Sequence, residues 1–154
     1  MIVVESTIQD IKKAELARFA RRAQKLAGVP GEIAVLIADN CRIQELNRRF
    51  RKKNEPTDVL SFPRARGGDI AISAEIALDN AGLYGHAPLD EFKILVLHGL
   101  LHLAGHDHEN DQGEMAAQES LLRKKLKLPD SLIDRAHSLR RPNRRNHQPA
   151  RKKR

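Results

Sequence analysis

The segment at residues 88–105, PLDEFKILVLHGLLHLAG, constrains the fold of this chain more than any other. It opens with Pro88, Asp90 and Glu91, which are residue types that favour a helix N-terminus. Apolar residues then follow on almost every side of the predicted helix, which indicates that the helix is buried all round. The sequence therefore predicts a central helix with the rest of the domain built around it.

The flanking segments alternate between strand and helix patterns. Apolar residues in helical spacing predict further helices at residues 8–27, 40–51, 74–83 and roughly 110–126. Short apolar runs between turn signals predict strands at residues 1–5, 31–39, 58–63 and 68–73. The sequence thus predicts an α+β fold, in which a small mixed sheet of four strands is packed with about five helices in a single domain.

Two local signals refine this prediction. Asn40 is a residue type that caps helices, so it is the predicted N-cap of the helix at residues 40–51. Pro56 and Pro63 bracket the strand at residues 58–63. Because proline cannot donate to a strand ladder, we expect this strand at or near an edge of the sheet.

Length and composition limit the possible classes of protein. A chain of 154 residues forms one globular domain, and no apolar run reaches the roughly 18 residues that span a bilayer. The start, MIVVESTIQD, lacks the layout of a secretory signal. The single cysteine, Cys41, suits a reducing cytoplasm and is expected to be structural. Aromatic residues make up 3% of the chain, so aromatic stacking platforms for single-stranded nucleic acid are not expected.

The net charge of +8 is concentrated at the C-terminal end. Eight of the 28 Lys and Arg residues lie at residues 140–154, and none of the 20 acidic residues does. This composition predicts a disordered basic tail after a domain at residues 1–139. Such a tail binds polyanions such as RNA by counterion release, whereas the plainer alternative is a solubilising segment without a partner. Its candidate RNA contacts are Arg140, Arg141, Arg144 and Arg145.

Four of the seven histidines lie within HGLLHLAGHDH, at residues 98–108. His98 and His102 are four residues apart, so on a helix they share one face and can reach one metal ion. His106 would lie about 12 Å along the axis from His98, at about 1.5 Å per residue, which is too far for the same ion. Gly105 offers a turn with positive φ, after which either His106 or His108 could fold over the ion.

The spacing favours His108, because H-x-x-x-H-x-x-G-x-x-H matches the glycine and the third histidine of the metzincin zinc motif. Three histidines with an open position are typical of catalytic zinc, although nickel or another late transition metal is chemically allowed. In the plainer alternative, these are ordinary histidines near a helix C-terminus, where the dipole favours imidazolium.

Zinc proteases carry a glutamate general base immediately after the first histidine, and this chain has Gly99 there. The ordinary peptidase mechanism therefore lacks its base.

Three motifs of the chain resemble those of the YbeY family, the bacterial endoribonucleases of ribosome maturation. HGLLHLAGHDH resembles the H-G-x-L-H-L-x-G-y-D-H signature of that family. LNRRFRKKNEPTDVLSFP, at residues 46–63, resembles its L-N-x-x-y-R-x-k-d-x-P-T-D-V-L-S-F-P block, and GGDIAIS resembles its G-D-I-x-I-S strand. The similarity covers about residues 1–128. It implies a zinc-dependent, single-strand-specific endoribonuclease that acts in 16S rRNA 3′-end maturation and ribosome quality control, with the small ribosomal subunit as partner.

Carried over to this chain, the resemblance places the three zinc ligands on His98, His102 and His108, at the end of the buried helix. It places a functionally important arginine on Arg51. The chain departs from the family pattern at His106, which replaces a usual tyrosine and adds a competing ligand or a proton carrier. Asn54 replaces a common aspartate, which would loosen the turn before Pro56.

Arg51 has a planar guanidinium group that is suited to bidentate contact with phosphate oxygens. We therefore expect metal-assisted RNA hydrolysis in which Arg51 holds the scissile phosphate. The neighbouring cations either extend a surface for the phosphate backbone or form a solvated helix end; they are Arg48, Arg49, Lys52 and Lys53.

Three polar residues of the TDVLSFP segment either line the cleft or form local hydrogen bonds: Thr57, Asp58 and Ser61. The general base is open between Asp107, His106 and the 2′-hydroxyl group of the RNA.

Two other functions compete with the nuclease. One is a non-catalytic assembly factor that docks on the ribosome and has a structural metal, and the other is a metallopeptidase with an unconventional base, which Gly99 argues against. Neither a membrane nor a small-molecule cofactor is expected as a partner.

Overall fold

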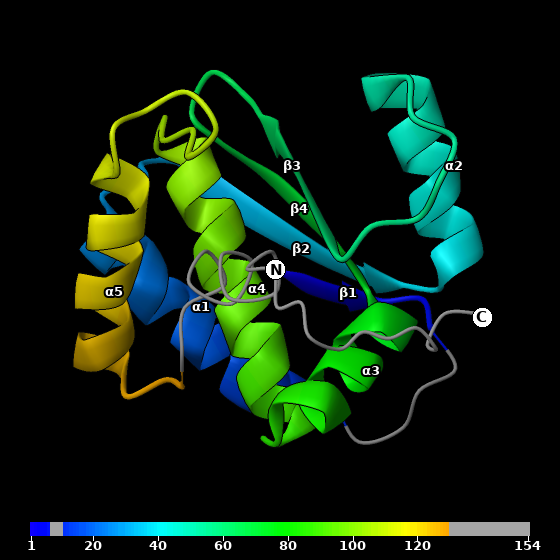
Figure 1. Ribbon diagram of the computed structural model, residues 1–154, viewed down its shortest axis with the longest axis horizontal. Coiled ribbons are helices and arrows are strands. Elements are labelled where there is room, and N and C mark those ends of the chain that lie inside the picture. Colours follow the sequence, from blue (N-terminus) through cyan, green and yellow to red (C-terminus); the bar gives the residue numbers. More distant parts are fainter. Residues whose placement is uncertain (7–10, 130–154) are drawn as a thin grey trace, which may run out of the picture.

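Helix α4 (Pro88–Leu103) lies at the centre of the computed structural model, which describes residues 1–6 and 11–129 (Figure 1). Its side chains are buried along most of its length, among them Phe92, Leu95 and Leu100. Helices α1 (Lys13–Ala27) and α5 (Glu114–Leu126) pack beside it on the same side of the sheet (Figure 1). The predicted central buried helix is confirmed.

The sheet has four strands in the order β1-β2-β4-β3. Strands β1 (Ile2–Val4), β2 (Glu32–Ala38) and β4 (Gly67–Ser73) are parallel to one another. Strand β3 (Val59–Pro63) pairs antiparallel with β4 and lies at the edge of the sheet. A single domain with a mixed four-stranded sheet is therefore confirmed, and so is the position of the proline-bracketed strand at the edge.

The two faces of the sheet support different elements because side chains alternate along a strand. Ile70 and Ile72 of β4 belong to the main core, with α1 and α4. Ala71, between them, belongs to a smaller cluster with Ile43 of helix α2 (Asn40–Arg51). Helix α2 therefore covers the opposite face of the sheet from α4, and Figure 1 shows it standing apart from the other helices.

Helix α3 (Ala74–Tyr84) follows β4 directly, and Ser73 caps it by accepting a hydrogen bond from the backbone N–H of Ile76. The cap of α2 differs from the prediction. Asp39 holds the N-cap position, and Asn40 is the first helical residue, whose side-chain oxygen accepts a hydrogen bond from Ser73 at 2.5 Å. The amide of Asn40 thus joins α2 to the start of α3 instead of capping its own helix.

Two predicted helices begin later than expected. Helix α1 starts at Lys13 because Lys12 adopts a left-handed backbone conformation, and residues 7–10 of the predicted helix lie outside the described residues. Helix α5 starts at Glu114, after Gly113 with φ 100°. The carboxylate of Asp111 accepts hydrogen bonds from the backbone N–H groups of Gly113 and Met115, and these bonds fix the start of α5.

The predicted domain end at residue 139 and the tail at residues 140–154 lie outside the described residues. The four tail arginines therefore stay predictions. Within residues 1–6 and 11–129, the helices are all too short or too polar to cross a bilayer.

Candidate metal centre

Three histidines converge at the C-terminal end of α4. His98 is buried in the helix, His102 lies one turn later, and His108 follows the end of the helix. One candidate ligand atom from each residue lies within 4.8 Å of the other two. The ring centroids are 4.8 Å apart for His98 and His102, and 5.5 Å and 5.6 Å from these two rings to His108. The cluster has the size that one metal ion can bridge.

The chain returns to the helix because α4 ends in a tight turn. The backbone N–H of His106 donates to the carbonyl of Leu101 at 3.0 Å, and Gly105 has φ 101°. Only glycine adopts that backbone conformation without strain. The predicted turn at Gly105 is confirmed, and it lets His108 face the two helical histidines.

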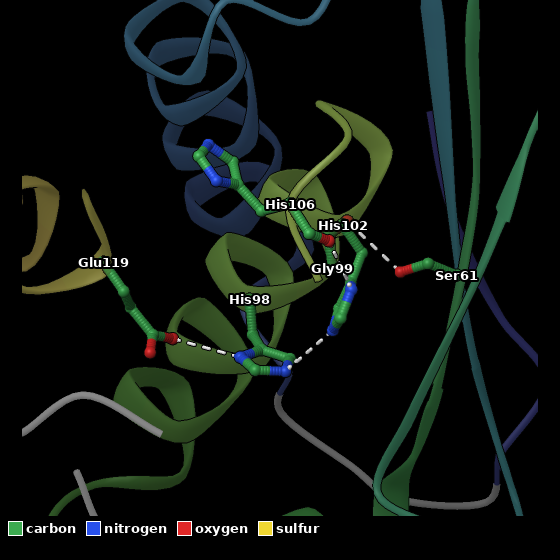
Figure 2. Close-up of polar contacts among 6 residues, drawn as sticks. All are labelled: Ser61, His98, Gly99, His102, His106 and Glu119. Atoms are coloured by element: carbon green, nitrogen blue, oxygen red, sulfur yellow. Dashed lines mark hydrogen bonds and ion pairs between the residues drawn. The ribbon is translucent and has the colours of Figure 1, made fainter. Parts of the chain in front are cut away.

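Hydrogen bonds fix the orientation of the two helical imidazoles (Figure 2). The Nδ1 atom of His98 lies 3.2 Å from a carboxylate oxygen of Glu119 on α5, and Nδ1 of His102 lies 3.1 Å from the backbone carbonyl oxygen of His106. Both acceptors require the proton on Nδ1. The Nε2 atoms of His98 and His102 face each other at 3.2 Å, and in the neutral Nδ1–H tautomers each carries a lone pair.

The neutral form of His102 is favoured at neutral pH. Burial, followed by the neighbouring His98, lowers the pKa of His102 from its ordinary value of 6.5 to about 4. A metal ion binds only neutral imidazole, so His102 needs to lose no proton when an ion binds at pH 7. Desolvation and the nearby rings thus prepare His102 as a ligand.

Two features indicate that a cation fits this site. Two Nε2 lone pairs 3.2 Å apart repel each other unless a proton or a cation lies between them. The Nδ1 atom of His108 is buried and has no hydrogen-bond partner within the described residues, which suits a ring whose polar partner is an ion. Three imidazoles are a donor set for zinc and other late transition metals.

A cleft of about 820 Å³ opens beside the cluster. Its walls include the three histidines, the edge strand β3 and the end of α2, where Arg51 lies. Arg51 donates a hydrogen bond to the backbone carbonyl of Ser61, and its guanidinium lies 5.6 Å from the centre of the Phe62 ring. Arg51 and the histidines therefore share one cleft, although they are far apart in the sequence.

Gly99 packs tightly against the sheet. A Cβ atom at this position would lie 2.9 Å from a side-chain carbon of Ile70 on β4. The carbonyl of Gly99 accepts a hydrogen bond from the buried hydroxyl of Ser61 at 3.2 Å (Figure 2). The position at which zinc proteases carry their general base is thus occupied by close contact between α4, β4 and β3.

The other predicted cleft residues have local bonds as well. Ser61 lines the cleft and is bonded to Gly99. Thr57 and Asp58 also line the cleft, and the Asp58 carboxylate accepts a hydrogen bond from the backbone of Val59 at 2.8 Å. Both interpretations of these residues are therefore compatible with the geometry.

His106 and Asp107 lie in the turn after α4, and both line the cleft. Figure 2 shows the His106 ring directed away from His98 and His102, so the contribution of His106 to the cluster is its carbonyl oxygen. The Asp107 carboxylate accepts hydrogen bonds from the Asn110 side chain and from the Glu109 backbone, and these bonds lower the pKa of Asp107.

The basic run at residues 48–53 is exposed. Lys53 lines the cleft together with Arg51, whereas Arg48, Arg49 and Lys52 lie outside the lining. Asn54, which we expected to loosen the following turn, accepts a hydrogen bond from Gln44 of α2 at 3.0 Å.

Two residues that support the site were missed from the sequence. Glu119 is 1% exposed and orients His98. Its signal in the sequence is an acidic residue among Met115, Leu122 and Leu126 on the buried face of α5. Asn47 is also buried, and its amide donates to the carbonyl of Glu55 at 2.8 Å, which ties α2 to the loop before β3.

The fold and this cluster together define a class: a small α+β protein with a candidate three-histidine metal centre at the end of its central helix, open to a cleft that contains an arginine.

Comparisons with known proteins narrow the class. The family model described as Endoribonuclease YbeY matches residues 2–127. A protein of Koribacter versatilis named Endoribonuclease YbeY is 51% identical over 138 residues, which cover 88% of this chain and 91% of the relative. One of Solibacter usitatus with the same name is 46% identical over 130 residues, which cover 83% and 88%. The chain belongs to the endoribonuclease YbeY family, and this membership places it among the nucleases, which hydrolyse phosphodiester bonds.

A solved structure supports the fold. The solution structure of a Thermotoga maritima protein superposes with a TM-score of 0.59 at 24% sequence identity, and the match covers 99% of this chain and all of the other.

Proposed function

We propose that the protein is a zinc-dependent endoribonuclease, specific for single-stranded RNA, that acts in 16S rRNA 3′-end maturation and ribosome quality control. One observation carries this proposal: a single cleft of about 820 Å³ contains both the three-histidine cluster and Arg51. A phosphate bound at Arg51 would therefore lie in the same cleft as the candidate metal centre.

The metal would be held by His98, His102 and His108. Three neutral imidazoles suit Zn²⁺, and other late transition metals are alternatives. When bound, the ion supplies a Lewis acid for phosphoryl oxygen and makes a water nucleophile available near pH 7. Glu119 and the carbonyl of His106 keep the Nδ1 protons in place, so that both Nε2 atoms are available as ligands.

The role of Arg51 is to bind and orient the scissile phosphate. Its hydrogen bond to Ser61 and its contact with the Phe62 ring hold the guanidinium at the cleft wall. A guanidinium has five N–H donors, so the bond to Ser61 leaves others for phosphate oxygens. Lys53, on the same wall, adds positive charge for the backbone of the RNA.

Three candidates for the general base remain: Asp107, His106 and the 2′-hydroxyl group of the RNA. The hydrogen bonds that lower the pKa of Asp107 make its carboxylate a weaker base. Asp107 is thereby less favoured than the other two groups.

The proposed partners are precursor 16S rRNA and the small ribosomal subunit in the cytoplasm. The exposed cations of residues 48–53 support this part of the proposal, since such runs bind the phosphate backbone by counterion release.

The test is cleavage of a defined RNA by the purified full-length protein. A labelled single-stranded fragment of the 16S rRNA 3′ region is incubated with the wild-type protein, with His98→Ala, with Arg51→Ala and with His86→Gln. We expect that His98→Ala abolishes cleavage and metal retention together. Arg51→Ala should slow cleavage by about 10²-fold or more while the metal stays bound. His86→Gln, which changes a histidine outside the cleft, is the matched control and should cleave at the wild-type rate.

Other outcomes would contradict the proposal. Cleavage that is equal in wild-type protein and His98→Ala would show that the activity does not depend on this site. Binding to the small subunit without any cleavage would favour the non-catalytic assembly factor. Cleavage of casein in proportion to the zinc content would favour the metallopeptidase. Gly99, which packs against Ile70, argues against that function because it supplies no general base next to His98.

A further inference from the structure

Two phenylalanines meet beside the cleft, in spite of the low aromatic content of the chain. Phe50 lies in the last turn of α2 and Phe62 on β3, with ring centroids 5.4 Å apart and an angle of 65° between the rings. Phe62 is partly buried and packs against the small cluster under α2, so it is fixed in place. Phe50 is 56% exposed. The edge-to-face contact therefore holds an exposed aromatic ring on a rigid support.

Positive charge surrounds this pair. The guanidinium of Arg49 lies 5.2 Å from the centre of the Phe50 ring, and that of Arg51 lies 5.6 Å from the centre of the Phe62 ring. Arg48, Lys52 and Lys53 are exposed in the same run. The other large apolar residues exposed in the described part lie in other elements, outside this run; they are Met1, Val3, Leu78, Leu83 and Leu121. Phe50 is the aromatic residue among these exposed side chains, and a cationic run surrounds it.

An exposed aromatic ring within a cationic rim is complementary to single-stranded nucleic acid. Its phosphates bind the cations, and an unpaired base stacks on the ring. A protein partner would need acidic groups together with an apolar residue, whereas each nucleotide supplies both an anion and a planar ring. Because Arg51 contacts Phe62 and also lines the cleft, the pair adjoins the proposed phosphate position.

We propose that Phe50, supported by Phe62, is a stacking site for an unpaired nucleobase of the RNA that enters the cleft. This inference rests on the proposed function and adds a subsite to it. A base inside a duplex cannot leave its stack without cost, so the site would select single-stranded RNA. Every base has a π-face, so the site would be tolerant of sequence.

The test is equilibrium binding of a short single-stranded RNA that carries the fluorescent base 2-aminopurine, measured with full-length protein. Stacking quenches this base. Phe50→Leu keeps the apolar volume and removes the π-face, and Phe50→Tyr keeps both. Leu83→Ala, an exposed apolar position on α3, is the matched control. Gel analysis after each titration confirms that the RNA is intact.

We expect Phe50→Leu to weaken binding roughly 5- to 10-fold, at the lower end of the range for a stacked base, and to remove the quenching. Phe50→Tyr and Leu83→Ala should bind as the wild type does. The salt dependence of binding should stay unchanged in Phe50→Leu, because no phosphate contact is lost, whereas Arg48→Gln should flatten it.

An abasic scan locates the subsite. A single abasic nucleotide is moved along the RNA, and one position should weaken binding to wild-type protein while leaving Phe50→Leu unaffected. The proposal is overturned if Phe50→Leu binds and quenches like the wild type, or if it weakens duplex and single-stranded RNA equally. It is also overturned if the variant loses affinity only for protein components of the small subunit.

These results separate this inference from the proposed function. Binding that depends on Phe50 without any cleavage would support the stacking site and reject the nuclease activity of the cleft. Cleavage and binding that are indifferent to Phe50 would reject only the stacking site. A wild-type protein that does not bind RNA would reject both.

Discussion

The two ends of helix α4 each pair a histidine with a buried glutamate. At the start of α4, His86 precedes the helix and Glu91 lies in its first turn. His86 is 2.7 Å from a carboxylate oxygen of Glu91, which is fully buried. Near the other end, His98 lies 3.2 Å from Glu119, which is 1% exposed. The pairs are alike in chemistry and burial, so their surroundings determine what each can do.

The neighbours of the first pair, His86 and Glu91, connect two helices. The amide of Asn80, on α3, donates to Glu91 at 3.3 Å, and the Tyr84 ring is stacked on His86 with centroids 6.5 Å apart. These contacts fasten α3 to the start of α4. At the other end, the second nitrogen of His98 faces His102 and the cleft. A buried His–Glu pair is therefore not a functional site in itself; convergence of further imidazoles on a cleft makes the difference.

The strongest test of this comparison is metal content. Replacing His98, His102 or His108 by Ala removes one of the three proposed ligands, and we expect bound zinc to fall from about one equivalent to near zero. His86→Gln should retain the full amount. Elemental analysis of freshly purified protein measures both, and circular dichroism verifies folding. Retained zinc in all three Ala variants would remove the distinction between the two ends.

The second test concerns the two glutamates. Glu119→Gln weakens the acceptor that orients His98, and we expect the zinc affinity to fall by about 10- to 100-fold, as for other groups that orient a metal ligand. Glu91→Gln should leave the affinity unchanged. Competition with a chelating dye gives both constants. Equal losses in the two variants would indicate that the effect is general destabilisation.

The third test applies to the first pair alone. His86→Ala removes a partner of the buried Glu91 carboxylate, and we expect the free energy of unfolding to fall by roughly 1–3 kcal/mol. Urea unfolding with and without added zinc measures the loss. A drop in zinc affinity in the folded variant would contradict a purely structural role for this end.

The smallest expected effect is the acid sensitivity of the metal-free cluster. The folded state lowers the pKa of His102 from 6.5 to about 4, so between these values the unfolded chain binds a proton that the folded chain does not. The free energy of unfolding contributed by this group is therefore complete above pH 6.5 and falls as the pH is lowered toward 4. Urea midpoints of chelator-treated protein at pH 7 and pH 5 should differ less in His102→Gln than in the wild type.

Much of the fold was predictable because its signals are local. The apolar residues of α4 repeat in helical spacing, Pro56 and Pro63 restrict β3 to an edge, and Gly105 marks the turn that redirects the chain. The spacing of the histidines depends on that helix and that turn, so their convergence followed from the same signals.

The rest depends on contacts between distant segments. Glu119 reaches His98 across 21 residues, and the contact exists only because α5 packs beside α4. The start of α5 was predicted too early because the side chain of Asp111 caps a helix that begins after Gly113. The meeting of Phe50 and Phe62 likewise depends on how α2 covers the sheet, which composition does not reveal.

The close approach of Gly99 to Ile70 limits how this scaffold could evolve. A glutamate at position 99 would need Ile70 or the whole of α4 to move, and a shift of α4 would carry His98 and His102 with it. A mutation at this position could therefore add a peptidase base only by displacing Ile70 from its contact or by disturbing the donor geometry. Any lineage that gained protease activity from this architecture would have to recruit its base from a loop, or first rebuild the strand beneath the helix.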